Sequence, residues 1–339
     1  MDRAALLYEG GHDQHWLVKK YEQMPIDLDI INSSAVVKNP ASILKEYDYV
    51  IFFDSMLDSD RGRKAVDIIL SHFKEPIAML DDRDDPVILR YMHHPNLKYF
   101  KREFRRLPWD TITIIGYNIS WMYWYRAHGR PLPLTLPEAI QAYEAGRILP
   151  LPLSISSAVN DSIIQRLQGT TKNYSISMVG VTHYTSRLRN FIARGASPRR
   201  RLLIAKELRT IPNSFVLMGY KDDKDWRPLS VEDYVTTIAR STSSVATRGS
   251  GFDTYRYYEI PALNSVLLAD TLRIVIPNDF VAGKEAIFFS EPKELISIVE
   301  TLVSDERLAK RIAEAGHRKY EEFHTPQRRL MYLIEELKR

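Results

Sequence analysis

The fold is decided by the stretch Arg248-Gly-Ser-Gly-Phe-Asp-Thr-Tyr-Arg-Tyr-Tyr-Glu-Ile-Pro-Ala262, which leads into the apolar run Ser265-Val-Leu-Leu-Ala-Asp270. A short strand over Ser243–Ala246 precedes a loop that contains Gly249 and Gly251. A helix is expected to follow this loop, and the apolar run after the helix is typical of a buried parallel strand. The order strand, glycine loop, helix, strand predicts an α/β domain.

The same stretch also predicts a ligand. Glycines allow backbone amides to approach a ligand closely, and a helix N-terminus favours an anion. Arg248 and Arg256 add positive charge beside the loop, and the carboxylate of Glu259 accepts hydrogen bonds from hydroxyl groups. A phosphate at the loop and hydroxyls at the carboxylate together indicate a nucleotide sugar. The alternatives are a helix-surface salt bridge for each arginine and, for Glu259, an acid that merely suits the first helical turn.

The segment Arg248–Asp270 resembles the donor-binding motif of GT-B glycosyltransferases, and within that fold it is most similar to the spore-maturation CgeB-like group of the family-one-type transferases. The resemblance continues through Gly283-Lys-Glu-Ala-Ile-Phe-Phe-Ser290, Ala313-Glu-Ala-Gly316 and His324-Thr325. The first half of the chain matches only in general layout and at Tyr99-Phe-Lys-Arg-Glu103 and Leu149-Pro-Leu-Pro-Leu153. The resemblance implies two Rossmann-like domains that face each other across a cleft.

The resemblance implies roles for individual residues of the second half. Glu259 would hold the ribose hydroxyls of the donor, and the donor phosphates would meet the loop residues and basic side chains, namely Gly249, Gly251, Arg248, Arg256, His183 and Arg187. Many GT-B enzymes carry a further glutamate eight positions before Glu259, where this chain has Gly251. Asp253 lies close to that position in the sequence and is the expected substitute as the contact to the donor sugar.

The length of 339 residues predicts two domains, and the apolar content of 45% is ordinary for a globular protein. Strand-like and helical runs alternate in both halves, which predicts parallel sheets. A proline-rich stretch that ends at Leu149-Pro-Leu-Pro-Leu153 separates them. We expect an acceptor-binding domain over residues 1–150, a nucleotide-sugar-binding domain over 171–322, and a carboxy-terminal helix over 323–339 that crosses back to the first domain.

The expected strands of the first half are Ala4–Tyr8, Leu28–Ile31, Tyr49–Phe53, Ile77–Leu80, Leu97–Phe100 and Thr111–Ile115, with helices over Arg61–Phe73 and Pro86–Met92. Those of the second half are Ser175–Val181, Ser214–Met218, Ser243–Ala246, Val266–Ala269 and Ala286–Phe289. The helices expected there are Leu202–Arg209, Val231–Ala239, Pro292–Leu302, Glu306–Glu322 and Gln327–Lys338.

The loop after the first strand contains Gly11, His12 and Asp13. It lacks the three spaced glycines of a dinucleotide fingerprint, which argues against an NAD enzyme. In GT-B proteins this loop borders the acceptor cleft, so Gly11 is a candidate acceptor contact. His12 or Asp13 is the candidate general base on an acceptor hydroxyl, as an inverting mechanism requires. The alternative is a glycine turn followed by a helix cap at Asp13.

Acidic residues follow the expected strand Ile77–Leu80. Asp82 and Asp84 are candidate acceptor contacts, and their spacing also occurs in metal-dependent GT-A transferases. Because Asp85-Pro86 makes a good helix start, the residues also fit a loop and cap. We expect no metal site and no cofactor, with the nucleotide-diphosphate sugar serving as co-substrate.

The net charge of +4 is a mild excess, with basic residues gathered at Lys98–Arg106 and Arg199–Arg201. These clusters indicate either solvated faces or a surface for an anionic acceptor or membrane. The chain has no cysteine, and it shows neither a signal peptide nor an apolar run long enough to span a membrane. Together these features predict a cytoplasmic protein.

The sequence therefore predicts a metal-independent glycosyltransferase that moves a sugar from a nucleotide-diphosphate sugar to a glycan, lipid-linked or other hydroxyl acceptor. Three alternatives stay open. A DNA-modifying glycosyltransferase predicts salt-sensitive binding to nucleic acid, and a donor-binding or glycan-binding module predicts nucleotide binding without turnover. A metal-dependent GT-A transferase predicts loss of activity with a chelator.

Overall fold

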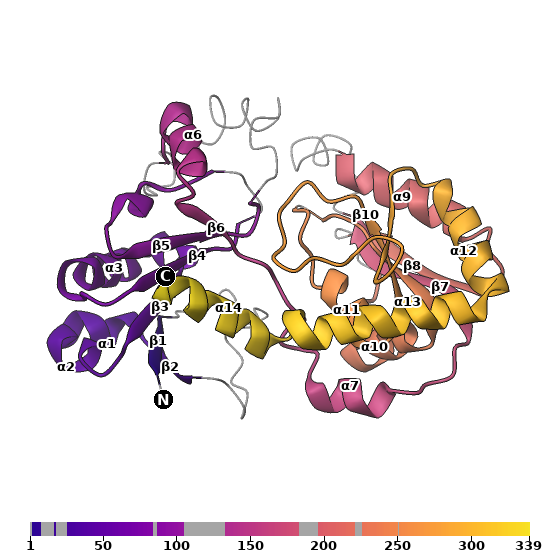
Figure 1. The fold of residues 1–339 in the computed structure, drawn as a ribbon, viewed down its shortest axis with the longest axis horizontal. Coiled ribbons are helices and arrows are strands. Elements are labelled where there is room, and N and C mark those ends of the chain that lie inside the picture. The colour runs from indigo at the N-terminus through magenta and orange to yellow at the C-terminus, as the bar shows by residue number, and fades with distance from the viewer. Residues whose placement is uncertain are drawn as a thin grey trace. The chain divides into compact units, whose positions relative to one another are not determined.

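The structure is a computed structural model, and it describes residues 2–7, 17, 26–83, 87–104, 133–182, 196–220, 226–249 and 251–339 (Figure 1). Contacts between Cα atoms divide the chain into two compact units. Unit 1 consists of Met1–Pro152, Arg273–Pro277 and Pro326–Arg339, and unit 2 of Leu153–Leu272 and Asn278–Thr325. The last helix, α14 (Pro326–Lys338), thus belongs to the same unit as the first strand.

Unit 1 is built on a six-stranded sheet in the order β2-β1-β3-β4-β5-β6, and all neighbouring strands pair in parallel. The strands are β1 (Arg3–Leu7), β2 (Asp27–Ile31), β3 (Tyr49–Phe53), β4 (Ile77–Asp81), β5 (Leu97–Lys101) and β6 (Ile148–Pro150). The helices are α1 (Ser33–Lys38), α2 (Pro40–Leu44), α3 (Asp60–His72), α6 (Leu136–Glu144) and α14, with 3-10 turns at Asp54–Asp58 and Arg90–His93.

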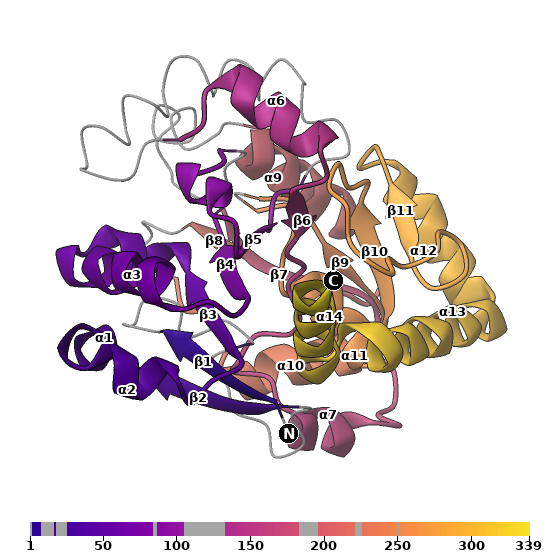
Figure 2. The same cartoon turned by 60° about the vertical axis from the view of Figure 1, so that its left-hand side comes forward.

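Successive side chains of these strands point to opposite faces of the sheet. One face carries Phe52, Met79 and Tyr99 into a core with α3, whereas on the other the ring of Phe100 meets Tyr332 of α14 edge-on at 6.4 Å. Helices α1, α2 and α3 lie on one side of this sheet and α14 on the other (Figure 2). Because both faces are covered, the central strands β3 and β4 are apolar up to Asp81, the last residue of β4.

Unit 2 is built on a five-stranded parallel sheet in the order β11-β10-β9-β7-β8. Its strands are β7 (Tyr174–Thr182), β8 (Ser214–Tyr220), β9 (Ser241–Ala246), β10 (Val266–Asp270) and β11 (Ile287–Phe289). Its helices are α7 (Asp161–Leu167), α9 (Ala196–Leu208), α10 (Val231–Ala239), α11 (Arg256–Ala262), α12 (Glu294–Ser304) and α13 (Glu306–Lys319), followed by a π-helical turn at Tyr320–His324.

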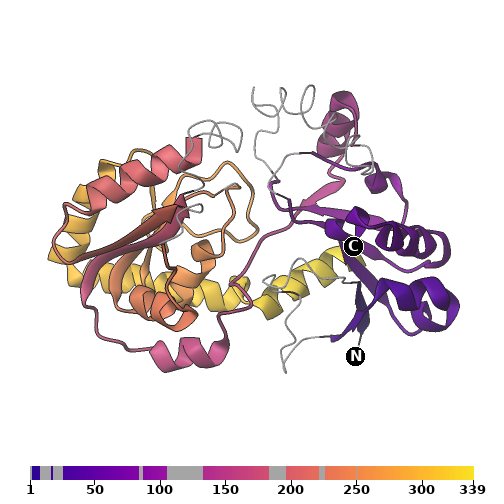
Figure 3. The same ribbon diagram turned by 180° about the vertical axis from the view of Figure 1, so that it is seen from behind.

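Both faces of the second sheet are covered as well. Seen from behind, the sheet lies between the salmon helix α9 and the orange helices α10 and α11 (Figure 3). The face toward α9 and α12 is apolar and includes Ile176, Val245 and Leu268. Toward α10 and α11 the strands carry small residues, and the buried hydroxyl of Ser244 lies 2.7 Å from that of Ser177.

The expectation of an α/β protein with two parallel sheets is confirmed. The helix expected over Pro86–Met92 is wrong for its described part, where only a 3-10 turn begins at Arg90. Strand β6 was missed because it ends in Pro150 within a proline-rich stretch. It lies at the edge of the sheet, where a residue without an N–H is tolerated. The expected strand Thr111–Ile115 lies outside the described residues.

The structure gives no sign of a transmembrane segment in the part of the chain that it describes, where every helix is too short or too polar to cross a bilayer.

Gly316 supplies a test of the packing in unit 2. A Cβ on Gly316 would lie 2.6 Å from the carbonyl oxygen of Glu285, which belongs to the backbone and cannot rotate away. Gly316→Ala should therefore lower the free energy of unfolding by about 1–3 kcal/mol, although alanine is the better helix former. Denaturant unfolding checks this, with Ala315→Gly as a control that should cost about 1 kcal/mol from propensity alone. A more stable Gly316→Ala protein would contradict the packing.

Candidate functional site

The glycine loop follows β9 directly, so it lies at the carboxyl edge of the second sheet, where parallel α/β sheets bind ligands. The loop is closed on itself by the N–H of Gly249, which donates to the carbonyl of Gly251 at 2.9 Å. The guanidinium of Arg248 lies over the ring of Phe252, 5.1 Å from its centroid. These contacts connect the described residues of the loop to one another.

Asp270, the last residue of β10, supports the loop from the neighbouring strand. Its carboxylate accepts the backbone N–H of Arg248 at 3.1 Å and the Nε of Arg200 at 2.7 Å. Asp270 is buried, so its two hydrogen bonds are little disturbed by water. The loop is thereby attached to both β10 and α9.

Arg201 is the buried cation of this edge, with 8% of its surface exposed. Its Nε donates to the hydroxyl of Thr247 at 3.2 Å and to the carbonyl of Arg248 at 3.1 Å. Burial, followed by the nearby charge of Arg256, lowers the pKa of Arg201 to about 10. The side chain thus remains a cation at neutral pH, held in a place that disfavours positive charge.

Arg256, the first residue of α11, lies close to Arg201. Both guanidinium groups lie against glycine backbone: a Cβ on Gly180 would be 3.5 Å from Arg256, and a Cβ on Gly249 would be 3.4 Å from Arg201. Within the described part of the chain, the Nε of Arg256 is buried without a hydrogen-bond partner. Two close guanidinium groups beside glycine backbone suit a ligand with several anionic oxygens.

Glu259 is 3% exposed, and both of its carboxylate oxygens already accept hydrogen bonds. One accepts the hydroxyl of Tyr234 at 2.6 Å, and the other accepts the N–H of Ser156 at 3.3 Å. Burial and then the charge of Glu259 raise the pKa of Tyr234 well above its usual range, so this tyrosine stays a donor. A carboxylate oxygen has two lone pairs, which leaves capacity for a hydroxyl of a ligand.

The carboxylate of Asp253 is also engaged in a hydrogen bond, in this case with the backbone. Its carboxylate accepts the N–H of Leu153, the first residue of unit 2, at 2.8 Å, and the residue is 4% exposed. In this arrangement Asp253 ties the glycine loop to the start of its unit. The remaining candidates lie outside the described residues, namely Gly11, His12, Asp13, Asp84, His183 and Arg187.

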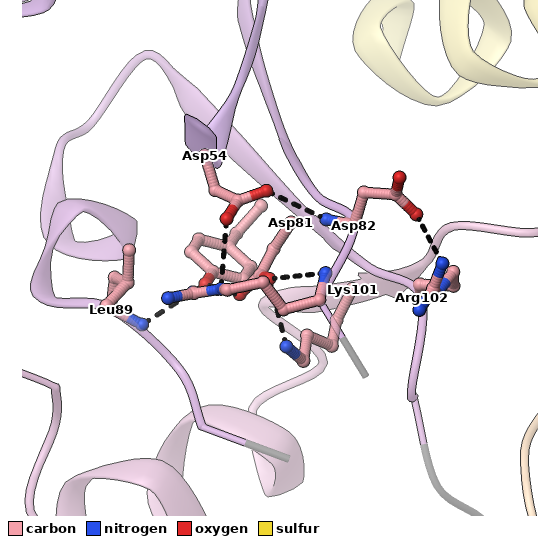
Figure 4. Close-up of polar contacts among 8 residues, drawn as sticks. Asp54, Asp81, Asp82, Leu89, Lys101 and Arg102 are labelled. Atoms are coloured by element: carbon pink, nitrogen blue, oxygen red, sulfur yellow. Dashed lines mark hydrogen bonds and ion pairs between the residues drawn. The ribbon is translucent and has the colours of Figure 1, made fainter. Parts of the chain in front are cut away.

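Unit 1 carries a second polar group at the carboxyl edge of its own sheet (Figure 4). At its centre is the fully buried Asp81, whose carboxylate accepts the hydroxyl of Tyr99, the Nζ of Lys101 at 2.9 Å and the Nη2 of Arg83 at 2.8 Å. Arg83 also reaches Asp54, with its Nε 3.0 Å from that carboxylate. Three successive strands thus contribute charged residues to one edge.

Asp54 in turn positions Asp82. Its carboxylate accepts the N–H of Asp82 at 3.1 Å, and the side chain of Asp82 pairs with the guanidinium of Arg102 at 3.0 Å. The carboxylate of Asp82 is directed away from the Asp54 and Asp81 side chains and toward Arg102 (Figure 4). The structure therefore brings the candidate Asp82 to the carboxyl edge of the sheet of unit 1.

The pKa values of two aspartates of this group are shifted in opposite directions by their surroundings. Burial raises the pKa of Asp54 to about 6, against the opposing charge of Arg83. Burial also acts to raise the pKa of Asp81, but the charges of Arg83 and Lys101 outweigh it and hold that pKa well below its usual range. Asp81 is the permanent anion of the group, and Asp54 is the aspartate that takes up a proton in mild acid.

A metal site is not evident in the described segments, where no three His, Cys, Asp or Glu side chains are grouped so as to hold an ion. Asp82 belongs to these segments and Asp84 does not.

Sequence reasoning missed Arg201 and Asp54 as site residues. The run Arg199–Arg201 fits either a solvated face or a surface for an anion, and helical spacing distinguishes its members. Arg201 shares a face with Ile204, Ala205 and Leu208, all of them buried. A charged residue on the core face of a helix was therefore the available signal. Asp54 had the signal of an acid placed directly after an apolar strand.

Comparisons with known proteins support the fold and its class. Residues 197–335 match a family described as glycosyl transferase-like, and this range contains Arg201, the glycine loop and Glu259. No curated protein matches the chain. With the two parallel sheets, the match supports the expectation of a GT-B type glycosyltransferase.

Solved structures are similar over the whole chain at low identity. The Anabaena protein HepE in complex with UDP-glucose has 12% identity and a TM-score of 0.52, with 99% of each chain covered. HepE with UDP and glucose has 13% identity and a TM-score of 0.51, with 100% of each chain covered. A putative UDP-N-acetylglucosamine 2-epimerase from Listeria monocytogenes has 10% identity and a TM-score of 0.45, covering 98% of this chain and 94% of that one. At these identities the likeness to HepE concerns the fold.

The raised pKa of Asp54 predicts a pH dependence of stability. The native state holds a proton on Asp54 up to about pH 6, whereas the unfolded chain releases it near pH 4. Stability from this group is thus fully present below pH 4 and is lost as the pH rises from about 4 to 6, a change on the order of 3 kcal/mol. Asp54→Asn should remove this loss.

Denaturant unfolding of wild type, Asp54→Asn and the exposed control Asp67→Asn between pH 4 and 7.5 checks the prediction. Equal pH slopes for wild type and Asp54→Asn would contradict it. Below pH 4 the lowered pKa of Asp81 acts in the other direction, because protonation of that carboxylate removes stability as the pH falls.

Proposed function

We propose that this protein transfers a sugar from a nucleotide-diphosphate sugar to an acceptor hydroxyl. The observation that carries the proposal is the pair of guanidinium groups, Arg201 and Arg256, set against glycine backbone at the carboxyl edge of the second sheet. The match of residues 197–335 to a glycosyl transferase-like family supports it, because that range contains both arginines.

The chemistry explains the need for buried positive charge. When an acceptor oxygen bonds to the anomeric carbon, the bond from that carbon to the β-phosphate oxygen breaks and negative charge grows on the leaving diphosphate. Arg201 and Arg256 would stabilise that charge, and their fixed positions would avoid reorganisation during the reaction. A base takes the acceptor proton in an inverting reaction, and His12 and Asp13 stay the candidates for this role.

In this proposal the donor binds to unit 2, on the segment 171–322, and the acceptor binds to residues 1–150. Glu259 accepts hydrogen bonds from the ribose hydroxyls. For this it uses the second lone pair of the carboxylate oxygen that also accepts the hydroxyl of Tyr234. HepE was crystallised with UDP-glucose, so a UDP-sugar is the first donor to test. The similarity of Arg248–Asp270 to the CgeB-like group and a cytoplasmic location belong to the same proposal.

Removal of either guanidinium should weaken donor binding. We expect Arg201→Ala and Arg256→Ala each to raise the Kd for UDP about tenfold to a hundredfold, because a hydrogen bond to a charged group contributes about 1.5–3 kcal/mol. The exposed Arg209, one residue past the end of α9, provides the control Arg209→Ala.

Calorimetric titration with UDP, GDP, dTDP, ADP and CMP sugars makes the comparison. Equal affinities for wild type and both arginine variants would contradict the assignment of the phosphates to this edge. The absence of any binder in wild type would contradict the donor site as a whole.

The reaction is proposed to need no metal ion, because the two arginines would supply the charge that a metal provides in other transferases. Transfer or slow donor hydrolysis should therefore be unchanged when EDTA is added, within about twofold. Product release from a radiolabelled UDP-sugar, followed with EDTA and with added Mg²⁺ or Mn²⁺, measures this. A loss of turnover with EDTA that Mn²⁺ restores would contradict metal independence.

A further inference from the structure

The charged group of unit 1 is not used by the donor chemistry, and its position calls for another explanation. Three carboxylates face three cations at the ends of β3, β4 and β5; the carboxylates belong to Asp54, Asp81 and Asp82, and the cations to Arg83, Lys101 and Arg102. Buried ion pairs seldom add stability over apolar residues of similar size, because desolvation offsets their attraction. The carboxyl edge of a parallel sheet is, however, the place where such folds bind ligands.

The network is layered. Asp81 and Lys101 are fully buried, and Arg83 connects Asp81 to Asp54. Above them lies the Asp82–Arg102 pair, with 6% and 12% of the side chains exposed. The backbone between the layers is fixed as well, because Asp54 accepts the N–H of Asp82 at 3.1 Å and Asp81 accepts the N–H of Arg102 through its carbonyl at 3.0 Å. The lower layer therefore sets the position of the outer pair.

The charges of the group indicate which kinds of ligand it favours. The six charges cancel one for one, and the buried Glu103 adds a further carboxyl group at the same edge. An anionic ligand would be attracted by Arg102 but repelled by Asp82. A cationic ligand would be attracted by Asp82 but repelled by Arg102. A neutral ring with several hydroxyl groups satisfies both, since hydroxyls donate to a carboxylate and accept from a guanidinium.

We infer that Asp82 and Arg102 form a subsite for a neutral, hydroxyl-rich sugar ring of the acceptor, held in place by Asp54, Arg83 and Lys101. The inference rests on the proposed function, to which it adds the class of acceptor. Asp82 and Arg102 would touch the ring directly, whereas Lys101 acts as a positioning residue through Asp81. The charge balance among these described residues disfavours the phosphates of a nucleic acid at this edge.

A glycan array tests the subsite with the full-length protein, fluorescently labelled, in the presence of UDP. The array carries neutral oligosaccharides beside their sialylated, sulfated and phosphorylated forms. Wild type should bind neutral glycans, and Asp82→Asn and Arg102→Gln should each weaken that binding about tenfold or more, the loss of one charge-assisted hydrogen bond. The exposed carboxylate of α3 supplies the control Asp67→Asn, which should bind as wild type.

The positioning role of Lys101 is tested by comparing the affinity for the acceptor with the affinity for UDP. Lys101→Met should raise the acceptor KM, or the Kd for the best neutral glycan, about tenfold while the Kd for UDP stays within twofold. If that single variant does not fold, the double variant Asp81→Asn/Lys101→Met removes one charge of each sign and answers the same question. Lys101→Arg should recover part of the affinity, since it keeps the cation.

The outcomes separate the two proposals. Binding of anionic glycans or of DNA in preference to neutral glycans would overturn the subsite, and so would wild-type glycan affinity in both Asp82→Asn and Arg102→Gln. UDP binding without any neutral glycan bound would overturn it too. Neutral glycan binding that depends on Asp82, with no nucleotide bound, would support the subsite and overturn the donor assignment instead.

Discussion

Both units depend on the same constraint, which is that all strands of a parallel sheet end at one edge. The central strands are largely apolar and covered on both faces, so the polar residues at their ends and directly after them are placed at that edge. In unit 1 these residues are Asp54, Asp81, Asp82, Lys101 and Arg102, and in unit 2 they include Thr247 and Arg248. The two candidate sites thus arise from one architectural rule applied to two sheets.

The two edges differ in their electrostatics, and the difference suits different ligands. In unit 2 burial, followed by the nearby charge of Arg256, lowers the pKa of Arg201. An anion bound there would offset the repulsion between the two guanidinium groups. In unit 1 every cation of the group is matched by a carboxylate, so the edge offers directed hydrogen bonds without excess positive charge.

Prediction from the sequence succeeded where the signal was local. Short apolar runs identified the strands, with ends within a residue or two of the observed ones, because a buried parallel strand needs little more than continuous hydrophobicity. It failed at β6, where Pro150 argued against a strand, because tolerance of proline depends on lying at the edge of a sheet. The identity of the edge strand is a property of the topology.

The roles of single side chains likewise divide into those that follow from local sequence and those that depend on the tertiary structure. The sequence by itself determined the α/β class, the glycine loop after β9 and the presence of arginines around it, because these follow from residue type and spacing along the chain. Only the tertiary structure decided that Arg201 is the buried arginine of its run, that Asp253 and Glu259 bond to backbone and tyrosine, and that Asp54 and Asp82 share one edge. Those outcomes join residues far apart in the chain, and burial and hydrogen-bond partners exist only once the strands have been brought together.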